Sequence, residues 1–177
     1  MGNKKKSKTV INQRIRKNFK SKEVFSPKKV KVVDGDTIKF ERNKYTFYLR
    51  LIGINTPELY KQKKNQNPQL YAIEARDRLD QLIHQADNIK IELHEDFIDA
   101  TWIRLLGYLH LSLHGKWIDA GKYLLLEGLA IPFMLDNLPI EMQYNYIISS
   151  YEAYKLRIGV YSVPGYVRFG RFHSDLS

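Results

Sequence analysis

The sequence predicts an α+β fold in which an antiparallel sheet is combined with three helices. Two observations lead to this prediction. Apolar residues alternate along short stretches between residues 30 and 54 and again between 89 and 113, as they do in strands. Between and after these stretches, apolar residues recur at helical spacing. Strands and helices that occur in separate runs are typical of α+β domains, and closure of five strands into a barrel would remove the sheet edges.

The first predicted element is a β-hairpin. Residues 30–33 and 37–40 alternate between apolar and polar types on either side of Asp34-Gly35, which is a strong hairpin signal. A further strand is expected from Tyr45 to Ile54, where aromatic and aliphatic residues alternate or run together. The ordered domain is therefore predicted to begin at residue 30.

The remaining elements follow from periodicity. Helices are predicted over residues 68–86, 117–129 and 139–160, and strands over 89–93 and 103–113. The two strands add to those of the first half, which indicates a domain built on an antiparallel sheet.

Basic residues are concentrated at the N-terminus. Residues 1–29 hold 11 of the 29 Lys and Arg residues and only Glu23 of the 19 acidic residues, whereas residues 30–177 have 18 of each sign. We expect residues 1–29 to form a flexible tail that can be deleted without loss of the fold. Such a segment is either simply solvated or contacts nucleic acid or anionic lipid.

Residues 30–163 are predicted to be a single domain, followed by a C-terminal tail over 164–177. In that tail, residues 165–172 interleave aromatic residues with arginines. This pattern suits stacking on single-stranded nucleic acid, but packing against the domain is the interpretation that we favour.

The composition excludes several classes of site. Without cysteine, the chain has no disulfide, thiolate metal site or thiol nucleophile, so any metal must be held by oxygen or imidazole. No apolar run reaches the roughly 20 residues that span a bilayer, and residues 1–25 lack the apolar stretch of a cleavable signal.

Polar residues at the ends of adjacent predicted strands indicate a site. Asp36, Asn55 and Glu58 can be brought together by hairpin pairing, and Arg50 lies on the same strand as Asn55. Oxygen ligands from separate strand ends suit calcium. Phosphodiester cleavage needs a cation, a base for water and guanidinium groups for the charge of the transition state.

Three motifs carry a family resemblance: Val33–Thr37, Leu49–Glu58 and Arg104–Tyr108. Together they resemble the thermonuclease (staphylococcal nuclease-like) family, and the similarity extends through 128–130 to cover roughly residues 30–160. The resemblance implies an OB-fold, a five-stranded β-barrel with three helices.

The resemblance also implies roles for individual residues. Asp36 and Asn55 match the side-chain ligands of a calcium ion, and the backbone carbonyl of Thr56 completes the ligands that the protein supplies. Asp34 is explained by the tight turn itself.

The catalytic positions match as well. Glu58 corresponds to the carboxylate that positions or deprotonates the attacking water, and Arg50 and Arg104 to two arginines that bind the phosphate. The implied partners are DNA and RNA, which the family cuts to 3′-phosphate products. We expect a monomer.

The chain departs from the family pattern at several positions. Asn55 occupies a position where the best-known family member has aspartate. We therefore expect weaker metal binding, a different metal preference, or compensation by Asp34 or Glu58. The substrate-stacking aromatic pair is replaced by residues 131–136, where Phe133 is a candidate substitute, and Trp102 is an additional aromatic before Arg104.

A lysine-rich loop is predicted near the site. Lys61, Lys63 and Lys64 correspond to a basic loop of the family and are expected either to attract the polynucleotide or only to be solvated.

The sequence therefore predicts a calcium-dependent, sugar-nonspecific endonuclease. The alternative is a noncatalytic OB-fold module that binds nucleic acid with a metal site degraded at Asn55.

Overall fold

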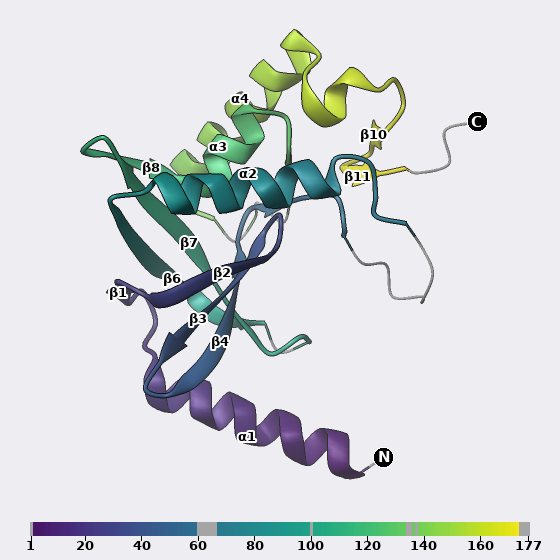
Figure 1. The fold of residues 1–177 in the computed structure, drawn as a ribbon. Coiled ribbons are helices and arrows are strands. Elements are labelled where there is room, and N and C mark those ends of the chain that lie inside the picture. Colours follow the sequence, from purple (N-terminus) through teal and green to yellow (C-terminus); the bar gives the residue numbers. More distant parts are fainter. Residues whose placement is uncertain (1, 60–66, 100, 134–135, 137, 174–177) are drawn as a thin grey trace.

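The computed structural model describes residues 2–59, 67–99, 101–133, 136 and 138–173. Seven strands form its main sheet: β1 (Val24–Phe25), β2 (Lys28–Asp34), β3 (Thr37–Arg42), β4 (Tyr45–Leu51), β6 (Asn88–Asp99), β7 (Arg104–Leu113) and β8 (Lys116–Asp119). Their order is β1-β6-β7-β4-β3-β2, and β8 also pairs with β7 (Figure 1).

The predicted hairpin is confirmed. β2 and β3 are antiparallel, with Asp34 opposite Thr37, so Gly35 and Asp36 form the turn between them. β3 continues into β4 with an unbroken antiparallel register from Thr37↔Arg50 to Arg42↔Tyr45. This meander carries Asp36 and Arg50 to the same end of the sheet.

The second half of the sheet joins the first through a parallel pair. β6 and β7 are antiparallel, and β7 runs parallel to β4 with Arg50 beside Leu106. Because β7 begins at Arg104, this pairing brings the start of β7 close to the end of β4 that carries Arg50. Two arginines that are 54 positions apart in the sequence therefore approach one pocket.

The three predicted helices are present as α2 (Ala72–Gln85), α3 (Ala120–Leu126) and α4 (Ile140–Leu156). α2 buries one face, formed by Ala72, Ala75, Leu79, Leu82 and Ile83. Residues 117–119 were predicted to be helical but belong to strand β8. They pair with β7 instead, and the carboxylate of Asp119 then accepts a hydrogen bond from the backbone N–H of Lys122 at 3.1 Å, which caps α3.

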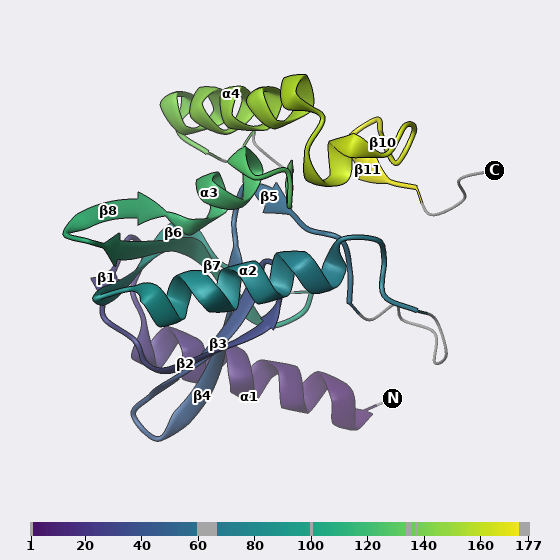
Figure 2. The same ribbon diagram turned by 45° about the horizontal axis from the view of Figure 1, so that its top comes forward.

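Two small sheets complete the fold. β5 (Ile54–Asn55) pairs with β9 (Ile131–Pro132), and β10 (Val167–Arg168) pairs with β11 (Arg171–Phe172) after the short 3-10 helix η2 (Gly159–Ser162). α3 and α4 pack together at one end of the molecule, and Figures 1 and 2 both show β10 and β11 beside the beginning of α2.

The predicted α+β class is confirmed, but the barrel is not closed. Five strands are long, as expected, and β1 and β8 are short additions. Among the described residues, the strand pairings form an open mixed sheet that is consistent with an OB-like fold. No described helix is long and apolar enough to cross a membrane. The predicted loop with Lys61, Lys63 and Lys64 lies outside the described residues.

The N-terminal segment differs from the predicted flexible tail over residues 1–29. Gly2–Asn18 forms helix α1, and the side chains of Ile15 and Phe19 are only 2% and 3% exposed. The Phe19 ring contacts Phe47 edge-on with ring centroids 4.8 Å apart. The sheet also begins with β1 and β2, before residue 30. The aromatic core therefore extends into the segment whose lysines suggested an appendage.

Candidate active site

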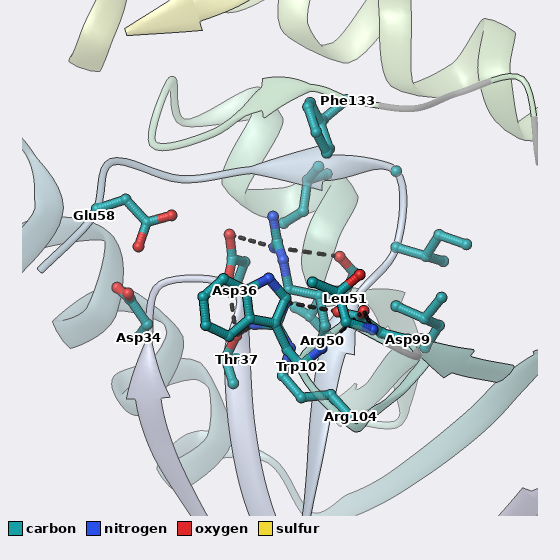
Figure 3. Close-up of a pocket in the computed structure, with 15 residues that line it drawn as sticks. Asp34, Asp36, Thr37, Arg50, Leu51, Glu58, Asp99, Trp102, Arg104 and Phe133 are labelled. Atoms are coloured by element: carbon teal, nitrogen blue, oxygen red, sulfur yellow. Dashed lines mark hydrogen bonds and ion pairs between the residues drawn. The ribbon is translucent and has the colours of Figure 1, made fainter. Parts of the chain in front are cut away.

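An open pocket of about 560 Å³ lies where the β2–β3 turn, the end of β4 and the β6–β7 connection meet. Its polar and aromatic lining residues are Asp34, Asp36, Thr37, Arg50, Glu58, Asp99, Thr101, Trp102, Arg104 and Phe133 (Figure 3). The pocket thus contains every catalytic residue predicted from the sequence, together with Asp36.

Asp36 is held in the turn by a set of short polar contacts. Its carboxylate accepts hydrogen bonds from the Thr37 hydroxyl at 3.0 Å and from the backbone N–H of Thr56 at 3.1 Å. The Thr56 hydroxyl donates to it at 3.2 Å. Gly35 allows this approach, because a Cβ atom there would lie 2.7 Å from the Thr56 hydroxyl oxygen and 2.9 Å from the Ala75 Cβ. The carboxylate of Asp36 is therefore buried and fixed in orientation.

Arg50 bridges two residues that were predicted to bind metal. Its guanidinium forms an ion pair with Asp36 and donates a hydrogen bond to Asn55 Oδ1 at 2.9 Å. The side chains of Arg50 and Asp36 are only 12% and 7% exposed. The predicted phosphate-binding arginine thus neutralises the one carboxylate among the predicted ligands.

Arg104 approaches the pocket from the start of β7. Its guanidinium pairs with Asp99 at 3.0 Å and lies 3.5 Å from the Thr37 hydroxyl. Its Nε is buried and has no hydrogen-bond partner among the described residues. Arg104 therefore has one donor that is buried without a partner in the described part of the chain, while the residue itself lines the pocket.

Asp99 was not predicted from the sequence. Burial alone would raise the pKa of its carboxyl, but hydrogen bonds from Arg104 and from the backbone N–H of Trp102 outweigh burial, so its pKa is lowered. The signal that could have revealed it is an acidic residue at the end of the strand that pairs directly with Arg104. Asp99 positions the guanidinium.

Glu58 lies on the other side of the pocket, near Asp34 (Figure 3). Burial of its carboxyl, followed by the charges of Asp36 and Asp34, raises the pKa of Glu58 to about 7. Burial likewise raises the pKa of Asp34. The segment is fixed by Gln69, whose side-chain oxygen accepts from the backbone N–H of Glu58 at 2.7 Å. A carboxyl with such a pKa can exchange protons near neutral pH.

Two exposed aromatic residues border the pocket. Trp102 is 60% exposed and Phe133 is 41% exposed, and both line it. In Figure 3, the Trp102 ring lies in front of Asp36 and Thr37, and Phe133 lies at the upper side of the pocket. Both side chains are therefore partly open to solvent at the pocket.

The sequence model of staphylococcal nuclease homologues matches residues 48–162, which is well over half of the chain. The chain belongs to the staphylococcal nuclease homologue family. A comparison with curated proteins found no match. The match begins within β4, so it includes Arg50, Glu58 and Arg104 but not the β2–β3 turn with Asp36. The turn joins the site through its contacts with Thr56 and Arg50.

In this family member, three oxygens remain as candidate ligands for a cation: the Asp36 carboxylate, the Asn55 amide and the Thr56 carbonyl. The described residues contain no group of three or more His, Cys, Asp and Glu side chains that could hold a metal ion. Asp36 and Asn55 nevertheless converge on one positive group, the Arg50 guanidinium. This donor set fits a calcium ion that keeps several waters, but it offers a single charged ligand, for which Arg50 competes.

Proposed function

We propose that the chain is a calcium-dependent endonuclease that hydrolyses phosphodiester bonds of DNA and RNA to leave 3′-phosphate ends. One observation carries this proposal: two arginines and a carboxyl with a pKa of about 7 line the same open pocket. Phosphodiester hydrolysis needs groups that bind the phosphate, groups that stabilise the negative charge of the transition state, and a group that accepts a proton from water. The two arginines can meet the first two needs, and Glu58 can meet the third.

The residues would act as follows. A scissile phosphate entering the pocket would accept hydrogen bonds from the guanidinium groups of Arg50 and Arg104, which both line it, since a guanidinium fork matches phosphate oxygens. This contact requires Arg50 to leave Asp36 and Asn55, at least in part. The charge of the pentacoordinate transition state would then be stabilised by both guanidinium groups.

Glu58 would serve as the general base. In its ionised form the carboxylate accepts a proton from a water molecule, whose oxygen forms a new bond to phosphorus. The bond from phosphorus to the 5′ oxygen breaks, and that oxygen takes up a proton to leave as the 5′ hydroxyl. A calcium ion held by Asp36, Asn55 and the Thr56 carbonyl would supply further positive charge toward the phosphoryl oxygens.

The test is product analysis on single-stranded DNA and on RNA, with calcium or with a chelator, for the natural chain and Glu58→Gln. We expect cleavage of both substrates only with calcium, with 3′-phosphate ends, and a loss of about 10²-fold or more in Glu58→Gln. Cleavage that is equal in Glu58→Gln, or that leaves 5′-phosphate ends, would refute the mechanism.

A second candidate function is noncatalytic binding of nucleic acid. The ion pair between Arg50 and Asp36, together with the uncharged Asn55, favours it, because the cation site is already neutralised. Binding that survives a chelator, without cleavage at any calcium concentration, would support this candidate.

A further inference from the structure

The β10–β11 hairpin ends in an exposed phenylalanine. Val167 pairs with Phe172 and Arg168 pairs with Arg171, so Phe169 and Gly170 form a two-residue turn. Both turn residues have positive φ, 50° and 67°. The Phe169 residue is 98% exposed.

The position of Phe169 is not explained by local structure or by packing. A turn with positive φ at both central residues favours Asn-Gly or Gly-Gly, and a bulky residue in the first position is strained. Burial does not compensate for this strain, because almost all of the residue faces solvent. Strain that the fold does not need points to a function in contact with a partner.

The charges beside Phe169 indicate the chemistry of that partner. Arg168 and Arg171 lie directly opposite each other, and both are exposed. Like charges in that arrangement destabilise a hairpin. Neither guanidinium forms an ion pair within the described part of the chain. The hairpin therefore presents a flat ring between two cations, which is complementary to a base flanked by phosphates.

The base of the hairpin is anchored to the segment that carries Glu58. Tyr166 is fully buried, and its hydroxyl donates to the backbone carbonyl of Leu70 at 2.7 Å. The preceding residue, Gln69, forms hydrogen bonds with the backbone of Glu58 in both directions, at 2.7 and 3.0 Å. The base of the hairpin is thus tied to one wall of the pocket.

We propose that this hairpin is an accessory binding site for single-stranded nucleic acid. The ring of Phe169 stacks on an unpaired base, and Arg168 and Arg171 bind neighbouring phosphates. That the bound nucleic acid continues from the hairpin into the pocket rests on the proposed nuclease function, whereas binding at the hairpin does not. A lipid surface is a poorer match, because a single small apolar group anchors a protein only marginally to a membrane.

The test measures binding of a fluorescent oligothymidine to the full chain in a chelator, where no cleavage is needed. Phe169→Asn introduces a residue that this turn favours, so the fold should be retained and the melting temperature should not fall. We expect its affinity to fall about 10-fold, with Phe169→Trp close to the natural chain. Tyr144→Asn, which removes an aromatic residue that is 66% exposed on α4, should change little.

The salt dependence of binding tests the two arginines separately. Replacement of both Arg168 and Arg171 by alanine should reduce the slope of log affinity against log salt by about 1.4, the value for two phosphates of a single strand. Binding to a fully paired duplex should depend less on Phe169, because its bases are already stacked.

Several outcomes would overturn the proposal. These are no binding of the natural chain to the oligonucleotide, unchanged binding in Phe169→Asn, or an equal loss in Tyr144→Asn. If Phe169→Asn lost binding to anionic vesicles but retained binding to the oligonucleotide, the hairpin would instead be assigned to a membrane surface. Because the assay requires no catalysis, absence of nuclease activity would refute the proposed function and leave this inference standing.

Discussion

The guanidinium of Arg50 forms an ion pair with the buried carboxylate of Asp36. The same guanidinium donates to Asn55, so one side chain contacts both side-chain oxygens that the resemblance assigns to a metal ion. Binding of a cation and of a phosphate are therefore linked, since each requires Arg50 to exchange its partner.

Arg50→Met should destabilise the metal-free protein. Removal of one partner leaves the Asp36 carboxylate buried without a charge partner, which costs about 3–5 kcal/mol. Calcium should restore part of the loss, because it can occupy the vacated position. Chemical denaturation with chelator and with calcium measures this. Lys155→Met, which breaks a surface pair with Glu152, is the control and should cost about 1 kcal/mol or less. Equal losses in the two variants would contradict a structural role for the buried pair.

Asn55→Asp should strengthen calcium binding. A second carboxylate adds charge to the donor set, and calcium affinity rises with the number of charged ligands. We expect a gain of about 10-fold, measured by calorimetry without nucleic acid. Asn88→Asp, at an exposed position at the start of β6, is a matched control for the added charge. The prediction fails if both variants change calcium affinity by the same factor.

Glu58 should make stability depend on pH. Its pKa is raised from 4.5 to about 7 on folding, so the folded state holds this proton more tightly than the unfolded state. Its ionisation therefore lowers the free energy of unfolding as pH rises from the ordinary value through the raised one. Glu58→Gln cannot ionise. In a chelator, Glu58→Gln should have the same melting temperature as the natural chain at about pH 4 and a higher melting temperature than the natural chain at about pH 8.

A melting-temperature difference between the two proteins that is constant across this pH range would show that the Glu58 pKa is not raised. Asp34 also titrates with a raised pKa, so Asp34→Asn should be measured in parallel to separate the two groups.

Arg104→Lys should impair turnover more than substrate binding. Lysine retains the charge beside Asp99 but lacks the planar fork of donors that matches phosphate oxygens. If that fork acts mainly in the transition state, kcat should fall by about 10²-fold with a smaller change in KM. A rise in KM at constant kcat would instead assign Arg104 to ground-state binding.

Phe19→Ala should destabilise the whole domain. The ring is 3% exposed and lies among Phe25, Phe40 and Phe47, so its removal leaves a cavity in the aromatic core. The expected loss is about 3–5 kcal/mol in denaturant unfolding. Val10→Ala, at a position of α1 that is 54% exposed, is the control and should have little effect. If Phe19→Ala had no effect, the N-terminal segment would be a dispensable tail after all.

Local signals explain which parts of the fold could be predicted. The Asp34-Gly35 turn, the alternation on either side of it and the periodic apolar face of α2 depend on neighbours in the sequence, and all three are present. α1 was missed as part of the fold, because a lysine-rich composition dominates a segment in which Ile15 and Phe19 are buried. Charge on one face of a helix does not prevent burial of another.

The site was predictable as a group of residues but not as a network. Asp36, Arg50, Glu58 and Arg104 line one pocket, whereas Asn55 and Thr56 are not among its lining residues. The bridge from Arg50 to Asn55 and the pairing of Arg104 with Asp99 depend on side-chain orientation and on contacts between strands that sequence spacing does not specify. Likewise, the strained exposure of Phe169 depends on a turn conformation that its residue type disfavours.

The most direct test of the account is a calcium titration of cleavage on single-stranded DNA, comparing the natural chain with Asn55→Asp and Glu58→Gln. The account predicts that the natural chain cuts, that Asn55→Asp reaches half-maximal rate at lower calcium, and that Glu58→Gln is impaired at every concentration. A natural chain that binds the strand but never cuts it, while Asn55→Asp does, would contradict the proposed activity and identify a nucleic-acid-binding member of the family.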